Sequence, residues 1–255
     1  MSNTNYNPED YWSTVGQRIE NRQGNDNVVA GDDEPYYRYK RQRFLELLKE
    51  IDFSQSSVLE VGSGPGGNLK VILDMHPKKL AGADISSQMV KLARSILPST
   101  VEIVKTNGIE LPFESGAFNI IFTSTVLQHN TDEKMLKSLM KDIARLKPKK
   151  IYFFERIEND IIGDELCLGR PVQYYADIMQ SNNYILKSTS YSNIRVSYYV
   201  SGVIRKVFNK PSRKEGEPIS KLSYFLQNIT LSITKHLDTV FKSKKDLARL
   251  EFELN

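Results

Sequence analysis

The 255-residue sequence contains one cysteine, Cys167, only three histidines and no long apolar run. A single cysteine excludes an intramolecular disulfide, and no stretch approaches the roughly 20 apolar residues that cross a bilayer. The net charge of +4 is too small to indicate a nucleic-acid-binding protein. The polar start, residues 1–8, lacks the apolar core of a signal peptide. We therefore expect a cytoplasmic protein, soluble or at most peripheral to a membrane.

Short apolar runs alternate with helical patterns through most of the chain. They predict strands and intervening helices at 57–61, 68–75, 79–84, 87–96, 101–105, 118–123, 131–146, 151–155 and 171–180. This alternation is typical of a parallel sheet with helices on both faces. Two β-rich runs, 184–191 and 195–200, are separated only by a turn and predict an antiparallel pair. The predicted fold class is α/β: a Rossmann-like parallel sheet with a C-terminal antiparallel hairpin and helical appendages at both ends.

The two flanks differ from this centre. Residues 1–35 are polar and either cover the substrate or form a flexible leader, and a helix is predicted at 36–50. Residues 202–255 hold 11 Lys/Arg against 6 Asp/Glu. After a charged linker at 211–218, nine apolar residues fall on one helical face: Ile219, Leu222, Phe225, Leu226, Ile229, Ile233, Leu237, Val240 and Phe241. We predict a helical cap at 1–54, the α/β domain at 55–201 and a basic amphipathic helical tail at 202–255.

The strongest local signal is the glycine-rich stretch that follows the first predicted strand. Gly62, Gly64 and Gly67 form a G-x-G-x-x-G pattern between a strand and a helix, the context in which nucleotide-type ligands bind. The pyrophosphate of a dinucleotide would be repelled by Glu60, two residues before the first glycine. The amino-acid end of S-adenosylmethionine (SAM), with its positive charges, would be attracted. Glu60 therefore favours SAM.

Asp84 closes the second predicted strand, about 20 residues further on, where a carboxylate can bind ribose hydroxyls. Either ligand has a ribose, so Asp84 does not discriminate between them. Structural alternatives stay open for both acids. Glu60 could be a solvated charge at a strand end, and Asp84 could cap the helix that follows Ser86.

Three segments in order, 58–68, 82–86 and 106–129, resemble the class I SAM-dependent methyltransferases. They are most similar to the small-molecule branch that includes the ubiquinone/menaquinone-type enzymes, over about residues 55–155. The resemblance implies SAM as the cofactor and S-adenosylhomocysteine (SAH) as the product. It also implies the cofactor-binding residues, namely Glu60, Gly62, Ser63, Gly64, Gly67, Asp84, Ile85, Asn107, Gly108, Ile109 and Thr123.

The resemblance assigns Glu60 and the glycines to the methionine part of SAM, Asp84 to the ribose and residues 107–109 to the adenine. The family usually has Asp where Asn107 stands. The carbonyl oxygen of an Asn can still accept a hydrogen bond from the adenine amino group.

The candidate catalytic residues are His129 and Glu155, which follow the fourth predicted strand and end the fifth. Methyl transfer depends mainly on positioning the acceptor, but a hydroxyl acceptor gains from a general base. A histidine titrates near pH 6.5 when unperturbed, so His129 is the first candidate. The alternatives are that His129 caps a helix or lines the pocket, and that Glu155 is structural. The histidines and Cys167 are scattered, so we expect no metal site.

The acceptor is the least defined part of this prediction. The flanks bear a faint likeness to methyltransferases of bacterial surface-glycan and nucleotide-sugar pathways, which makes a nucleotide-linked or lipid-linked sugar the leading acceptor. A quinone or another lipid is the alternative. From other classes, an NAD-type oxidoreductase or a non-catalytic SAM-binding subunit stays open. Candidate substrate-binding residues are Tyr11, Trp12, Tyr37, Arg38, Arg156 and Arg170, although both Arg156 and Arg170 could be ordinary surface charges.

The partners follow from the same features. A small molecule or glycan is expected as substrate, and no nucleic acid, because no Asn/Asp-Pro-Pro-Tyr-type motif follows the fourth strand, where residues 123–126 read TSTV. The apolar stripe of the tail has three interpretations. It packs against its own domain or a homodimer partner, it covers the acceptor pocket, or it lies on an anionic membrane surface.

Overall fold

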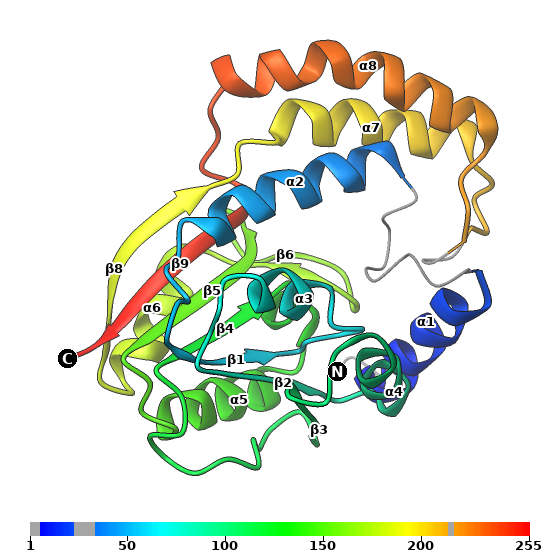
Figure 1. The fold of residues 1–255 in the computed structure, drawn as a ribbon. Helices are drawn as coiled ribbons and strands as arrows, with labels where there is room; N and C mark the ends of the chain where they lie inside the picture. The colour runs from blue at the N-terminus through cyan, green and yellow to red at the C-terminus, as the bar shows by residue number, and fades with distance from the viewer. Residues whose placement is uncertain (1–5, 23–33, 214–216) are drawn as a thin grey trace.

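A seven-stranded sheet forms the centre of the computed structural model, which describes residues 6–22, 34–213 and 217–255 (Figure 1). The strand order is β3-β2-β1-β4-β5-β9-β8. Strands β1 to β5 are parallel, and β9 runs antiparallel to both of its neighbours. The bounds are β1 Ser57–Val61, β2 Lys79–Asp84, β3 Glu102–Lys105, β4 Ile120–Ser124, β5 Lys150–Ile157, β8 Tyr184–Tyr191 and β9 Asp246–Leu254, with a separate small pair formed by β6 Ile162–Gly163 and β7 Leu168–Gly169. The predicted Rossmann-like fold class is confirmed.

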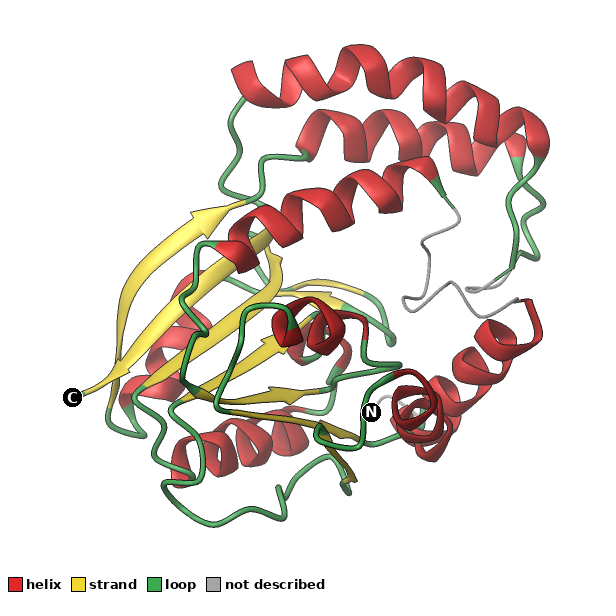
Figure 2. Ribbon diagram, viewed as in Figure 1, coloured by secondary structure: helices red, strands yellow, loops and turns green. Residues whose placement is uncertain are grey.

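Helices cover both faces of the sheet (Figure 2). One face is covered by α5 (Glu133–Arg145) and α6 (Val172–Gln180), and the other by α2 (Pro35–Lys49), α3 (Gly67–Leu73) and part of α4 (Ser87–Ile96). The N-terminal helix α1 (Pro8–Arg22) packs on α4. Helices α7 (Arg195–Phe208) and α8 (Lys221–Val240) pair with each other and lie over α2.

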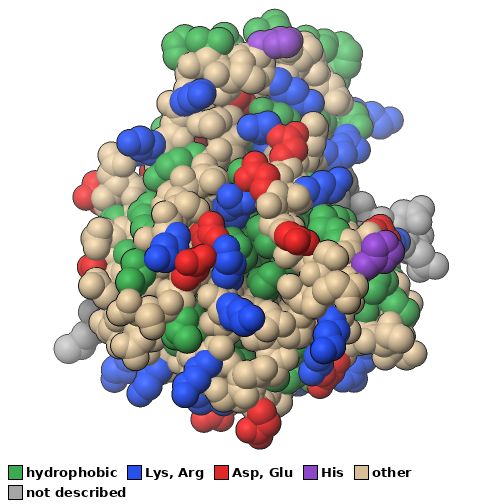
Figure 3. Space-filling model, turned by 60° about the vertical axis from the view of Figure 1, so that its left-hand side comes forward, with side chains coloured by type: hydrophobic (Ala, Val, Ile, Leu, Met, Phe, Trp, Pro, Cys, Tyr) green, Lys and Arg blue, Asp and Glu red, His purple; other side chains and the backbone are tan. Residues whose placement is uncertain are grey.

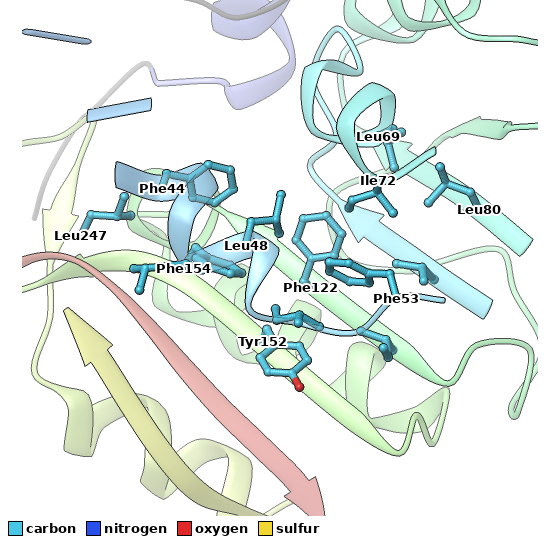
Figure 4. Close-up of a cluster of buried hydrophobic side chains, with 14 of the residues drawn as sticks. Phe44, Leu48, Phe53, Leu69, Ile72, Leu80, Phe122, Tyr152, Phe154 and Leu247 are labelled. Atoms are coloured by element: carbon cyan, nitrogen blue, oxygen red, sulfur yellow. The ribbon is translucent and has the colours of Figure 1, made fainter. Parts of the chain in front are cut away.

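The seat of α2 on the sheet is an aromatic and aliphatic cluster (Figure 4). Phe44 and Leu48 point from α2 toward Phe122 of β4 and Phe154 of β5, and the rings of Phe44 and Phe154 lie 4.9 Å apart between centroids. All four side chains are at most 4% exposed. Close packing of this kind fixes a helix in place, because moving it would open a cavity. Helix α2 is therefore held firmly beside the carboxyl ends of the parallel strands.

Two predictions for the C-terminal third are wrong in detail. Residues 195–200 begin the helix α7 instead of forming a strand, and the antiparallel partner of β8 is β9. In α7 the buried residues Ser197, Ser201 and Ile204 follow one another at helical spacing and face the interior. Because β9 belongs to the predicted tail, the tail ends as a strand of the central sheet instead of remaining helical throughout. The predicted leader (1–35) and linker (211–218) lie partly outside the described residues.

The predicted amphipathic helix of the tail is present as α8, but its apolar stripe does not pack against its own domain. Seven of the nine predicted stripe positions are exposed to solvent, and Ile219 and Leu226 are half-buried. Within the described ranges, no helix combines the length and apolar character needed to cross a membrane.

Candidate functional site

A cavity of about 610 Å³ opens where β1, β2 and β4 end. Its walls come from the glycine-rich loop, the loop after β4, and helices α1, α2 and α7. Ligands of open parallel sheets bind at this edge. Twelve of the predicted site residues line the cavity: Trp12, Tyr37, Glu60, Gly62, Ser63, Gly64, Gly67, Asp84, Ile85, Gly108, His129 and Arg156.

The glycine-rich loop is shaped by backbone that only glycine adopts easily. Gly62 has φ +73°, and a Cβ at this position would lie 2.1 Å from the Val126 side chain of the loop after β4. The Gly62 N–H donates to the carbonyl of Ala83 at 2.7 Å, which ties the loop to β2. The glycine therefore allows two loops to approach closely and leaves backbone open to the cavity.

Glu60 is almost completely buried at the floor of the cavity, with 1% of its surface exposed. Its Oε1 accepts a hydrogen bond from the Asn68 amide at 2.5 Å, and Arg41 in turn donates to the Asn68 carbonyl oxygen. Its Oε2 and the neighbouring Ser63 Oγ are buried and find no hydrogen-bond partner in the described part of the chain. Buried polar atoms without partners are uncommon, and in a cavity they indicate where a ligand donor binds. Burial raises the pKa of Glu60 to about 8.

We expect SAH binding to release a proton near neutral pH. The ligand's ammonium group favours the charged form of Glu60, so binding lowers its pKa from about 8. Affinity then rises with pH below that value, by up to about tenfold per pH unit. Calorimetric titrations in buffers of different ionisation enthalpy measure this proton. The release disappears in Glu60→Gln, which cannot titrate; a variant that still releases it would refute the assignment.

The same raised pKa has a consequence for folding. As pH rises from the ordinary value of 4.5, the unfolded chain loses the Glu60 proton before the folded protein does. The contribution of Glu60 to stability therefore falls between pH 4.5 and about 8. This is a cost of keeping a carboxyl group ready for a cationic ligand.

Asp84 connects the end of β2 to the glycine-rich loop. Its Oδ2 accepts the N–H of Gly64 and its Oδ1 accepts the N–H of Ser86, both at 2.8 Å. The helix that follows is capped by the side chain of Ser86, which accepts the N–H of Met89 at 3.2 Å. Helix capping was the alternative role predicted for Asp84, but the capping residue is Ser86. Asp84 is 7% exposed and keeps a face toward the cavity, within reach of a ligand hydroxyl.

The region predicted to hold the adenine is only partly as expected. Gly108 and Ile85 line the cavity, but Asn107 and Ile109 do not. The Asn107 Oδ1 accepts the backbone N–H groups of Ile109 and Glu110 at 3.0 and 2.8 Å, so it stabilises its own turn. The apolar walls here also include residues without a motif signal: Met89, Met135 and Leu139.

The ring of His129 is held by hydrogen bonds at both nitrogens. Its Nδ1 lies 2.8 Å from the carbonyl oxygen of Leu166, which only accepts, so Nδ1 carries the hydrogen. The Gln128 amide nitrogen donates to His129 Nε2 at 3.2 Å, while the Gln128 carbonyl accepts the N–H of Arg156 at 2.9 Å. The Nε2 lone pair is thereby the acceptor on this ring, and the Gln128 amide is its donor in this structure. Trp12 packs edge-on against the ring, 5.0 Å between centroids.

Glu155 does not line the cavity and is fully buried beneath the loop that follows β4. It accepts the hydroxyl of Thr123 at 2.8 Å and the backbone N–H groups of Val126 and Gln128 at 3.1 and 3.0 Å. Burial raises the pKa of Glu155. Glu155 was predicted to be catalytic and Thr123 to bind the cofactor. In the structure their hydrogen bonds instead hold the loop after β4 in place. The loop also contains Thr125 at φ +56°, a conformation that costs energy for a β-branched residue.

The predicted substrate-binding residues divide into two groups. Trp12, Tyr37 and Arg156 line the cavity, and the Tyr37 hydroxyl accepts a hydrogen bond from Arg205 at 2.8 Å. The other three, Tyr11, Arg38 and Arg170, do not line it. Arg38 is exposed and donates to Tyr224 of α8, while Arg170 is buried and donates to the carbonyls of Leu127 and Asn130.

Lys40 of α2 lines the cavity and carried no motif signal. Burial lowers its pKa. No acidic side chain within the described ranges forms an ion pair with it, although the neighbouring charges are paired. Glu34 binds Arg213 at 2.5 Å and Asp246 binds Arg195 at 3.1 Å, so Lys40 feels the charge of Asp246 without a direct ion pair to it.

Comparison with known proteins also indicates a methyltransferase. Residues 58–149 match the family model described as a methyltransferase domain. The ajmaline N-methyltransferase of Rauvolfia serpentina is 23% identical over 131 residues, which is 49% of this chain and 44% of that protein. The chain thus spans less than half the length of the first curated relatives it matches.

Solved structures show the same fold at low identity. The [4+2]-cyclase SpnF has a TM-score of 0.67 at 12% identity, with 96% of this chain and 95% of that chain covered. The magnesium protoporphyrin IX methyltransferase of Synechocystis, solved with SAH bound, has a TM-score of 0.57 at 12% identity, covering 97% and 98%. Residues 58–149 therefore match a methyltransferase domain, and this match together with the shared fold supports SAM, not a dinucleotide, as the cofactor.

Proposed function

We propose that this chain transfers the methyl group of SAM to a small acceptor that carries a negatively charged group, with a nucleotide-linked or lipid-linked sugar as the leading class. The observation that carries the proposal is the division of the cavity. One part of its lining is the glycine-rich loop with Glu60 and Asp84, and another is aromatic side chains and Lys40, beside the ion-paired acids Glu34 and Asp246. Lys40 forms no ion pair within the described ranges, so a phosphate linked to a sugar would give it a directly bonded counter-ion in addition to the charge of Asp246.

The residues present fit the cofactor. Glu60 Oε2 and Ser63 Oγ would accept hydrogen bonds from the amino group, Asp84 would bind the ribose, and Ile85, Gly108 and Met135 would enclose the adenine. When bound, SAM supplies an activated methyl group on a sulfonium, and no further cofactor is needed for the transfer. The chain's own contribution is then to position the acceptor and to remove its proton.

Proton removal is assigned in this proposal to His129. Its Nδ1–H bond to Leu166 fixes the ring so that Nε2 is the acceptor. An acceptor hydroxyl would replace the Gln128 amide as the donor to Nε2, since both are hydrogen-bond donors of similar reach. Trp12 packs edge-on against the ring and adds to its support. An amine acceptor would use the same pocket without needing the base.

The proposal is tested by measuring transfer of labelled methyl groups from SAM to UDP-glucose and UDP-N-acetylglucosamine, with methyl glucoside as an uncharged comparison. The phosphate-bearing acceptors are expected to be methylated faster. Lys40→Gln should raise the acceptor KM about tenfold or more and leave the KM for SAM unchanged, because a charge-assisted hydrogen bond is lost. His129→Gln should lower kcat about 100-fold at unchanged KM values.

The matched control is Lys49→Gln, which removes an exposed lysine from the same helix and should change neither parameter. An acceptor KM that does not respond to Lys40→Gln would reject the anionic acceptor. Methylation of methyl glucoside at the rate of the UDP-sugars would do the same. SAH binding with no transfer to any sugar would retain the cofactor site and reject this acceptor class.

A further inference from the structure

The outward side of α8 is an apolar face with no cover in the described part of the chain. Its exposed side chains are Leu222, Phe225, Ile229, Ile233, Leu237, Val240 and Phe241, with exposed fractions from 36% to 71%. Figure 3 shows hydrophobic side chains gathered at the upper end of the molecule, over α8, with lysine and arginine side chains beside them. Val203 and Val207 of the adjoining α7 are each 63% exposed. Exposed apolar patches of this extent mark interaction surfaces.

The inward side of α8 is mainly polar, with Leu231 as its one buried apolar residue, which is the reverse of an ordinary surface helix. Asp238 accepts the backbone N–H groups of Val196 and Ser197 at 2.8 and 3.3 Å, which caps the start of α7. Gln227 accepts the N–H of Tyr36 at 3.2 Å, which serves the start of α2. These side chains are at most 1% exposed.

These bonds fix the rotation of α8 about its axis. Turning the apolar face inward would bury hydrophobic side chains but would leave the starts of two helices without their hydrogen-bond partners. It would also move the Asp238 carboxylate away from its donors. The outward apolar face is therefore specified by the contacts beneath it.

The charged side chains around this face are mostly cationic. Residues 195–245 contain eleven Lys/Arg and three Asp/Glu. Within α8 the single acidic residue is the buried Asp238, so the exposed charged side chains are Lys221 and Lys235. Lys242 and Lys244, both exposed, follow the helix. The surface thus combines a hydrophobic centre with a cationic border.

We propose that the apolar face of α8 docks on an anionic lipid membrane. Interfacial helices have this arrangement: apolar side chains enter the boundary between headgroups and acyl chains, and flanking lysines bind anionic headgroups. A second copy of the chain fits less well, because pairing the face with itself would bring lysines of both copies together without acidic partners. This proposal does not depend on the acceptor, and vesicle binding can be measured without turnover.

The experiment is cosedimentation of the full chain with large unilamellar vesicles, either phosphatidylglycerol mixed with phosphatidylcholine or phosphatidylcholine alone. We expect binding to the anionic vesicles that weakens with added salt, and much weaker binding to the neutral ones. Ile229→Ser/Ile233→Ser should reduce the binding constant for vesicles about tenfold or more per isoleucine. In the unaltered chain each isoleucine side chain moves from water into the lipid on binding, and serine loses that gain. Both positions are exposed, so the substitutions do not disturb the core.

The matched control is Ile161→Ser/Ile162→Ser. These isoleucines are 55% and 50% exposed, against 50% and 62% for Ile229 and Ile233, but they lie outside the apolar face of α8. The control should bind like the unaltered chain. Three results would overturn the proposal: no binding to anionic vesicles, equal binding by the two double variants, or a lipid-free dimer, seen by light scattering, that Ile229→Ser/Ile233→Ser abolishes.

Discussion

Asp84→Ala is expected to weaken SAH binding about 100-fold or more. A charged carboxylate that accepts hydrogen bonds from ribose hydroxyls contributes about 1.5–3 kcal/mol per bond, and 2.7 kcal/mol corresponds to about 100-fold in affinity. The same substitution also removes the acceptor for the N–H groups of Gly64 and Ser86, so the glycine-rich loop loses its tie to β2. Isothermal titration of the purified chain with SAH measures the effect.

Two further variants separate ligand contact from loop support. Asp84→Asn keeps one carbonyl oxygen for the loop and should bind SAH more tightly than Asp84→Ala, but about tenfold more weakly than the unaltered chain. Asp74→Ala removes an exposed aspartate at the end of α3 and should bind normally. If Asp84→Ala stays within a few-fold of the unaltered chain while keeping its melting temperature, the ribose assignment is wrong.

The fold was predictable where the signal is local. The strands β1 to β5 are short, mainly apolar runs, and the helices between them have helical spacing and capping residues such as Ser86. Residues 195–200 were misassigned because their β-branched and aromatic side chains favour strands in isolation. Their helical state depends on contacts between Ser197 and residues of α8 about 40 positions later, such as Asp238.

Strand β9 has a local signal in the sequence. Leu250, Phe252 and Leu254 alternate with Arg249, Glu251 and Glu253, which is the period of a strand with two different faces. The longer helical stripe that ends at Phe241 favours a helix for the segment as a whole. The alternation begins only after that stripe, within the last ten residues.

The cofactor half of the site was predictable for a similar reason. Glu60, the glycines and Asp84 lie within a single βαβ unit, so sequence spacing fixes their geometry. Lys40 was not predictable, because its place in the cavity depends on how Phe44 and Leu48 seat α2 on the sheet. Arg170 is the opposite case. The sequence suggests a substrate role for it, but in the structure its guanidinium donates to the carbonyls of Leu127 and Asn130.

The proposed membrane surface bears on the acceptor. Helix α7 contributes Tyr198 to the cavity and also exposes Val203 and Val207 beside the apolar face of α8. Docking of that face would hold the cavity near the lipid headgroups. Vesicle binding would therefore favour a lipid-linked sugar over a soluble nucleotide-linked one, while both classes carry the phosphate that Lys40 would bind.

Glu155→Ala is expected to lower the free energy of unfolding by about 3 kcal/mol, the largest loss of stability in this set. The substitution leaves the Thr123 hydroxyl and the N–H groups of Val126 and Gln128 without their acceptor in a buried place. Each unsatisfied buried donor costs about 1–3 kcal/mol, partly recovered because a buried carboxyl group is also removed. Urea denaturation followed by circular dichroism measures the change.

The matched control for this prediction is Glu102→Ala, which removes an exposed strand glutamate paired with Lys79 and should change stability by less than about 1 kcal/mol. Glu155→Gln retains one acceptor oxygen, so its free energy of unfolding should lie between those of Glu155→Ala and Glu102→Ala. Because Gln128 orients His129, Glu155→Ala should also reduce kcat more than it reduces SAH affinity. A Glu155→Ala chain as stable as Glu102→Ala would mean that the loop after β4 does not depend on this carboxylate. Normal stability with lost turnover would instead return Glu155 to the catalytic role first predicted for it.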